Sequence, residues 1–209
     1  MKKRLKIRPF VLPTIYSLSI LVLVISIYYT AKTLKANEAD NYNTYVSEEV
    51  INTDEPTINT KVVMVTPYTD ANVKVGKGFY DYKGESKDQE NSIVKYNNTY
   101  MQNNGIDYIL DTEFEVVSVL DGKVVEVNND ETVGNTVVIE HENDIITTYE
   151  SLSDVKVKKG DVVRQGQQIG TSGTNKMEKE LGNHIYFQVT KNNKTLNPND
   201  CYNKDINEL

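Results

Sequence analysis

Residues 114–130 read FEVVSVLDGKVVEVNND, two valine-rich runs on either side of the dipeptide Asp121-Gly122. Valine favours extended backbone, and Asp-Gly readily adopts the positive φ angles of a tight hairpin turn. We therefore predict two strands joined in a hairpin at Asp121 and Gly122. Because glycine lacks a Cβ atom and tolerates positive φ, we expect both Gly122 and Gly170 to occupy turns of this kind.

Further short apolar runs lie on both sides of this segment, beginning with VVMV at residues 62–65. In most of them apolar and polar residues alternate with a period of two, which is typical of half-buried strands. The polar segment 174–181 predicts a surface loop or one helical turn. The downstream strand runs are 135–140, 144–152, 155–157, 162–163, 168–169 and 184–189. We predict a mainly β domain, built as an antiparallel β-sandwich or open barrel.

The amino-terminal part has a different composition. The run FVLPTIYSLSILVLVISIYY, residues 10–29, carries no charge and is long enough for a helix to cross the hydrocarbon core. Basic side chains precede it, which favours a cytoplasmic amino terminus and an extracytoplasmic domain. A cleaved secretory signal is the alternative, but its apolar core is usually shorter and is followed by small residues. We therefore predict a membrane anchor.

Together these features divide the chain into segments. The stretch after the anchor is polar and acidic, without the apolar periodicity of a packed element. The expected segments are a basic cytoplasmic tail (1–9), a transmembrane helix (10–30), an acidic linker or stalk (31–60), a globular domain (61–203, with its core at 103–198) and a tail (204–209).

Charge and cysteine content exclude some classes of protein. The formal net charge is −7, and the basic residues concentrate before the apolar run. A nucleic-acid surface needs clustered Lys and Arg, so we expect no nucleic-acid partner. Cys201 is the single cysteine and cannot form an internal disulfide, so the domain must be stabilised by its core.

The order of several motifs resembles the LytM, or lysostaphin-like, family of zinc metallopeptidases. The motifs are NNGID (103–107), VVSVLDGKVVEV (116–127), GNTVVIEH (134–141), TTYESL (147–152), VKKGDVVRQGQQIGTSGT (157–174), GNHIYFQV (182–189) and LNP (196–198). The resemblance implies a LytM-like fold of the duplicated hybrid motif type, with a groove that cuts peptidoglycan cross-bridges. A catalytic zinc takes three protein ligands and keeps one position for water.

The zinc site of that family is not preserved here. The resemblance implies a His, an Asp and a second His as ligands, and two further catalytic histidines. The corresponding residues are Asn103, Asp107 and Tyr186 at the ligand positions, and Ser151 and His184 at the catalytic positions. A carboxamide and a protonated phenol are poor zinc ligands. We therefore predict a vestigial groove with no catalytic residue, no metal and no cofactor.

His141 is the other histidine of the chain. It follows VVIE at the expected end of a strand, where a structural role is the simpler interpretation. An alternative is that His141, together with Glu142 or Asp144, supplies replacement ligands to an active zinc endopeptidase. That alternative requires His141 to approach Asp107 and His184.

A narrower resemblance is to a family of membrane-anchored sporulation proteins of endospore-forming bacteria, carried by RPFVLPTIYSL, TPYTDANVKVGKGFYDY and NNTYMQNNGIDYI. It implies a single-pass forespore membrane protein whose domain faces the intermembrane space during engulfment. The implied partner is an ectodomain of the stage III sporulation protein AH type from the mother-cell membrane, in a ring-forming channel complex. A module that binds peptidoglycan without cleaving it is a further alternative. For docking through a free strand edge, we consider residues 145–149 and 155–163.

Overall fold

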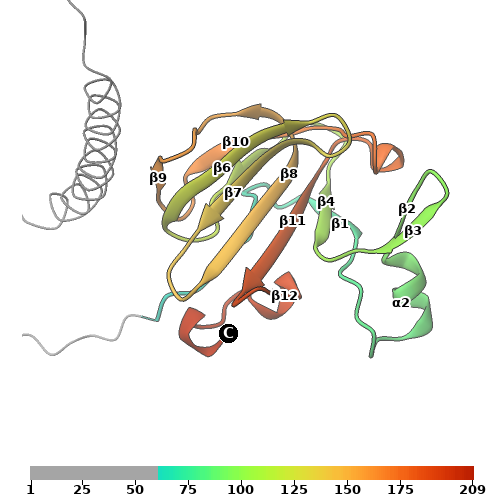
Figure 1. Ribbon diagram of the computed structural model, residues 1–209, viewed down its shortest axis with the longest axis horizontal. Helices are drawn as coiled ribbons and strands as arrows, with labels where there is room; N and C mark the ends of the chain where they lie inside the picture. Colours follow the sequence, from blue (N-terminus) through green and yellow to red (C-terminus); the bar gives the residue numbers. More distant parts are fainter. Residues whose placement is uncertain (1–60) are drawn as a thin grey trace, which may run out of the picture. The chain divides into compact units, whose positions relative to one another are not determined.

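The computed structural model describes residues 61–209. The predicted cytoplasmic tail at 1–9, the predicted transmembrane helix at 10–30 and the predicted linker at 31–60 lie outside the described residues. The described part is mainly β, as the sequence predicts (Figure 1). The strands are β1 (Lys74–Lys77), β2 (Ile93–Tyr96), β3 (Thr99–Gln102), β4 (Ile106–Ile109), β5 (Glu115–Val117), β6 (Gly122–Asp130), β7 (Gly134–Glu140), β8 (Ile145–Val155), β9 (Val162–Val163), β10 (Gln168–Ser172), β11 (His184–Lys191) and β12 (Lys194–Leu196). No helix among residues 61–209 is long and apolar enough to span a membrane.

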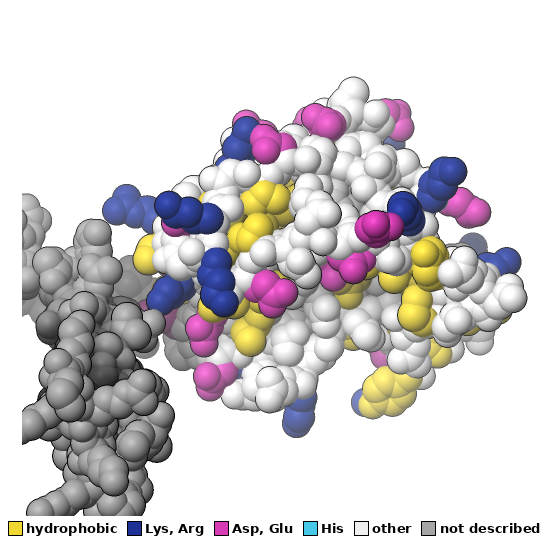
Figure 2. Space-filling model, turned by 45° about the horizontal axis from the view of Figure 1, so that its top comes forward, with side chains coloured by type: hydrophobic (Ala, Val, Ile, Leu, Met, Phe, Trp, Pro, Cys, Tyr) yellow, Lys and Arg dark blue, Asp and Glu magenta, His cyan; other side chains and the backbone are white. Residues whose placement is uncertain are grey.

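Ten of the strands form one antiparallel sheet. Seven of them lie side by side in the order β1-β4-β11-β8-β7-β6-β9, and β5, β10 and β12 are attached to this path. β10 pairs with both β5 and β8, and β12 pairs with β11. Strands β2 and β3 form a separate hairpin, which follows the short helix α2 (Ser86–Asn91) and projects from the main sheet in Figure 1. Figure 2 shows acidic and basic side chains interspersed over one face of the domain, with exposed apolar side chains between them.

β8 and β11 each bury one face, as expected from their period-two alternation. On β8 the side chains of Ile145, Thr147 and Tyr149 are fully buried, whereas those between them are partly exposed. Tyr149 packs against Phe187 of β11, with ring centroids 5.2 Å apart. The opposite face of these two strands is therefore free to form a site.

The predicted hairpin at Asp121-Gly122 is wrong. β5 pairs with β10, and β6 pairs with β7 and β9, so the two strands that flank this dipeptide do not pair with each other. The hairpin lies instead at the β6–β7 turn, where Gly134 has φ of 83°. Neither Gly122 nor Gly170 adopts positive φ. A Cβ atom at Gly122 would lie 2.6 Å from His141 Nδ1. This glycine therefore permits the start of β6 to approach His141 closely.

Two other expectations need correction. Residues 145–149 belong to β8, which is paired on both sides by β7 and β11 and offers no free edge there. β9 does lie at an end of the sheet, but it has only two residues.

VVMV at 62–65 forms isolated bridges rather than a strand. Within 174–181 the polar segment ends in a single 3-10 turn, Lys179–Leu181, as expected.

Candidate functional site

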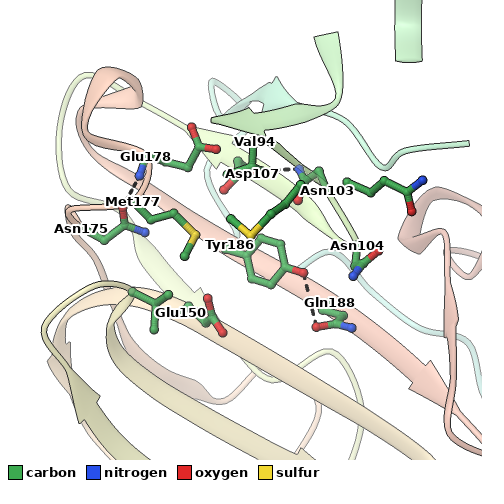
Figure 3. A pocket seen from close by; sticks show the side chains of 13 residues that line it. Val94, Asn103, Asn104, Asp107, Glu150, Asn175, Met177, Glu178, Tyr186 and Gln188 are labelled. Carbon is green, nitrogen blue, oxygen red and sulfur yellow. Dashed lines mark hydrogen bonds between the residues drawn. The ribbon is translucent and has the colours of Figure 1, made fainter. Parts of the chain in front are cut away.

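A cleft of about 230 Å³ opens on the free face of β4, β11 and β8 (Figure 3). Its floor includes Asp107 from β4, Tyr186 and Gln188 from β11 and Glu150 from β8. The walls come from the β2–β3 hairpin, the loop before β4 and the segment before the 3-10 turn. The wall residues include Val94, Met101, Asn103, Asn175, Met177 and Glu178.

The floor is set by the register of three neighbouring strands. Tyr186 is the cross-strand partner of Asp107 on one side and of Glu150 on the other. Adjacent strands lie about 4.8 Å apart, and directly paired residues point to the same face. Tyr186 therefore stands in a row between two acidic residues, and its phenol ring extends along β11 to reach Gln188.

Asn103 is tied to the carboxyl of Asp107. Its Nδ2 donates hydrogen bonds to Asp107 Oδ2 at 2.9 Å and to the Gly78 carbonyl at 3.1 Å. Both side chains are buried, with Asp107 only 1% exposed. The amide thus directs its donor nitrogen, which cannot coordinate a cation, toward Asp107.

Ser151 and His184 lie together next to the cleft, in contact with the cleft residue Asn175. His184 Nδ1 donates to the Gly182 carbonyl at 2.8 Å, which leaves Nε2 to accept a hydrogen bond from Ser151 Oγ at 3.0 Å. Asn175 Nδ2 in turn donates to Ser151 Oγ at 2.7 Å. Burial lowers the pKa of His184 and favours the neutral ring that this chain of bonds requires. Both Ser151 and His184 are fully buried, and neither lines the cleft.

His141 is held in a separate buried network. Its Nδ1 donates to the Asp121 carbonyl at 2.8 Å, and its Nε2 accepts from Thr147 Oγ1 at 2.7 Å. Burial lowers the pKa of His141, which keeps the ring neutral. Both ring nitrogens are engaged within the fold, so the side chain has no nitrogen free to act as a replacement ligand.

The ionised forms of the two carboxyl groups on the cleft floor, Asp107 and Glu150, are electrostatically unfavourable. Burial, followed by the charge of Glu178, raises the pKa of Asp107 to about 7, against the lowering effects of Asn103 and Lys77. Burial and the charge of Asp130 raise the pKa of Glu150 to about 7. Lys77 Nζ pairs with Glu178 Oε1 at 3.1 Å and donates to the Ile93 carbonyl. Within residues 61–209 this is the one ion pair at the cleft, and it leaves Asp107 and Glu150 without a paired cation.

The pKa of Glu150 predicts a pH-dependent stability. Between about pH 6 and pH 8 an unfolded Glu carboxyl is ionised, because its ordinary pKa is about 4.3. The folded carboxyl, with a pKa of about 7, binds more protons, so the free energy of unfolding should fall as pH rises through this window. Urea unfolding of the wild type and of Glu150→Gln, followed by circular dichroism, should give a smaller decrease for the variant.

The exposed Glu126 on β6 supplies the matched control, because Glu126→Gln removes a carboxyl outside the cleft. This control should reproduce the wild-type pH dependence. A decrease of the same size in Glu150→Gln and in the wild type would contradict the assignment to Glu150.

The three positions that the motif resemblance predicts as metal ligands carry side chains that do not fit zinc. Only Asp107 offers a carboxylate, and Asn103 presents its amide nitrogen. Burial, followed by the charges of Glu150 and Asp107, raises the pKa of Tyr186, so its phenol stays protonated. The Tyr186 hydroxyl donates to Gln188 Oε1 at 3.3 Å. No group of three His, Cys, Asp or Glu side chains in the described part of the chain is placed to hold a metal ion.

The sequence motifs predicted some of the residues that line this cleft. Asn103, Asp107 and Tyr186 line the cleft, whereas Ser151 and His184 contact each other and do not line it. Sequence reasoning missed Glu150, Met177 and Glu178. Glu150 had a detectable signal, since it follows buried Tyr149 in an alternating strand and must face the other side.

Comparisons with known proteins agree with this architecture. Residues 101–198 match the family model for Peptidase family M23. Stage II sporulation protein Q (SpoIIQ) of Bacillus subtilis is 37% identical over 140 residues, which cover 66% of this chain and 50% of that protein. The chain therefore spans about half the length of this curated relative.

Solved structures give the same relationship. A chain from the SpoIIQ–SpoIIIAH pore-forming complex is 36% identical with a TM-score of 0.69, and the match covers 71% of this chain and 96% of that chain. A zinc-containing peptidase from Vibrio cholerae is 26% identical with a TM-score of 0.53, and the match covers 66% of this chain and 39% of that one. With nearly the whole length of the sporulation chain matched at this identity, the protein belongs to the SpoIIQ-like proteins, which carry a domain of peptidase family M23.

Proposed function

We propose that the protein is a non-catalytic docking protein of sporulation. It binds a partner ectodomain of the stage III sporulation protein AH type across the intermembrane space and supports engulfment and a channel between forespore and mother cell. The comparison that supports this role is the match to a chain of the SpoIIQ–SpoIIIAH pore-forming complex. A ring-forming hetero-oligomer is the assembly that such a channel requires.

The observation that carries the non-catalytic assignment is the state of the ligand positions. Asn103 donates to Asp107 through its amide nitrogen, and Tyr186 presents a protonated phenol. Zinc bound by a lone carboxylate would lack the nitrogen donors that hold and activate it in such peptidases. The vestigial groove positions Asn103, Asp107, Ser151, His184 and Tyr186 therefore serve the fold and the cleft surface.

The membrane assignment rests on the sequence. Residues 10–30 form a transmembrane helix, residues 1–9 lie in the cytoplasm of the forespore, and residues 31–60 link the anchor to the domain. The uncharged run at 10–29 with basic residues before it supports this topology. The domain then faces the partner from the forespore membrane.

Two measurements on the purified chain, kept in detergent because of the apolar run, test the proposal. Elemental analysis should find no stoichiometric zinc, and a purified stage III sporulation protein AH-type ectodomain should be retained in a pull-down. About one tightly held zinc per chain, with chelator-sensitive cleavage of peptidoglycan, would establish the enzyme alternative. Retention on purified sacculi without binding to the ectodomain would favour a wall-binding module.

A further inference from the structure

The row Asp107, Tyr186 and Glu150 places an aromatic residue between two acidic residues on the cleft floor (Figure 3). Strand spacing puts the Cα atoms of the two acids about 10 Å apart, with the Tyr186 Cα atom between them. The ring extends from there along β11, where its hydroxyl reaches Gln188. A positive group above the ring would meet a carboxyl on each side. Aromatic rings attract cations through their quadrupole, and the attraction increases where water is excluded.

This floor lacks a counter-charge. Asp107 is 1% exposed, and its Oδ1 atom accepts no hydrogen bond from the described residues although the side chain lines the cleft. The Glu150 carboxyl has neither a hydrogen bond nor an ion pair within residues 61–209. Lys77 is already paired with Glu178. Buried carboxyls without a partner are costly, so a ligand that brings positive charge would be favoured.

The geometry fits an organic cation better than a metal ion. The acidic side chains of residues 61–209 do not converge as a group of three around one point, as a metal ion would require. They are instead spread across three strands with an aromatic ring between them. An ammonium or guanidinium group on a long side chain matches this spread, because its donors are distributed and its stem is apolar.

The walls match such a stem. The cleft is lined by the apolar side chains of Val94 and Met101 from the β2–β3 hairpin and of Met177 from the segment before the 3-10 turn. Methionine adapts its shape to a ligand better than branched residues do. The volume of about 230 Å³ accommodates one long side chain rather than a folded segment.

The cleft also continues into an exposed surface. Met101 lines the cleft and is itself 36% exposed, and its neighbour Tyr100 on β3 is 67% exposed. An exposed aromatic beside a deep pocket is typical of a protein interface, where a buried anchor is surrounded by further contacts. The described domain also carries more acidic than basic side chains, which complements a basic partner surface.

We infer that this cleft receives a lysine or arginine side chain of the partner ectodomain, which sits over the Tyr186 ring between Asp107 and Glu150. The inference rests on the docking function proposed above and assigns the docking surface to the vestigial peptidase groove and the adjoining β2–β3 hairpin. The Asp107 and Glu150 carboxyls neutralise the incoming charge, and the apolar walls cover its stem.

Binding of the purified partner ectodomain to the full chain in detergent, measured by biolayer interferometry, tests this assignment. Glu150→Gln and Tyr186→Leu should each weaken binding by about tenfold or more, because they remove a charge and the aromatic ring. Glu126→Gln, which lies outside the cleft, should bind like the wild type. Tyr186→Phe, which retains the ring, should bind more tightly than Tyr186→Leu. Thermal unfolding of each variant verifies that the domain is folded.

A scan of Lys→Ala and Arg→Ala changes in the partner completes the test. One partner position should reproduce the loss, and combining that change with Glu150→Gln should add little further loss. If the wild type binds but the cleft variants bind equally well, the cleft assignment is overturned while the docking function stands. If the wild type does not bind the ectodomain, both fail. If the cleft variants affect only retention on sacculi, the occupant is a wall amine and the partner assignment is overturned.

Discussion

Gly105→Ala is expected to lower the free energy of unfolding by about 3 kcal/mol, near the upper end of the usual cost of overpacking a core. Gly105 lies in the loop that leads into β4, beside the cleft floor. A Cβ atom there would overlap the backbone carbonyl of Phe187 and lie 2.7 and 2.8 Å from two ring atoms of Tyr186. The backbone of β11 cannot move away without breaking its pairing with β4. The Tyr186 ring can avoid the added atom only by changing its position in the cleft.

Gly78→Ala is the matched control, because its added Cβ would meet only Ser92 Oγ, at an ordinary contact distance of 3.5 Å. Neither glycine has positive φ, so the comparison isolates steric overlap from backbone strain. Thermal unfolding should show a decrease of roughly 10 °C for Gly105→Ala and little change for the control. Equal midpoints for the two variants would mean that the loop before β4 is displaced easily and does not hold Tyr186 in place.

Local patterns predicted the strands well, because alternation is a property of consecutive residues. The runs at 135–140 and 184–189 became β7 and β11 with nearly the expected bounds. Strand pairing is not local, and there the predictions failed. Asp121-Gly122 has the sequence of a hairpin turn, but β6 finds a better partner in β7 than in the three-residue β5. Helix α2 and the β2–β3 hairpin were not predicted, since residues 86–102 are mostly polar and lack a clear period.

For the site, too, local features could be predicted from the sequence and features that depend on strand pairing could not. Fixed spacings such as Asn103 to Asp107, and His184 to Tyr186, could be recognised from the sequence alone. The sequence could not show that Tyr186 lies in register with both Asp107 and Glu150, because that depends on how three strands align. Nor could it bring Met101 and Met177 into one cleft, since their segments are distant along the chain. The candidate positions of the ligands could therefore be named from the sequence, whereas the cleft and its charge required the fold.

The double variant Asn103→His/Tyr186→His is expected to bind about one zinc per chain, whereas the wild type binds none. Asn103 Nδ2 lies 2.9 Å from Asp107 Oδ2, so an imidazole at position 103 can approach the same carboxylate. Position 186 is the direct cross-strand neighbour of Asp107. Two imidazoles and a carboxylate then face one point, which is a common ligand set for a zinc ion that keeps one open position. Elemental analysis after gel filtration measures the bound metal.

The variant Asn103→His/Tyr186→Phe restores a single imidazole and is the matched control, since two ligands should not retain zinc through gel filtration. Adding Asp107→Asn to the double variant should likewise abolish retention. If the double variant unfolds cooperatively like the wild type but holds no zinc, positions 103 and 186 do not correspond to the ligands of the metallopeptidases. Zinc retention would instead show that the scaffold still has the geometry of a metal site. The loss of nitrogen donors alone would then separate this domain from an active peptidase of the M23 family.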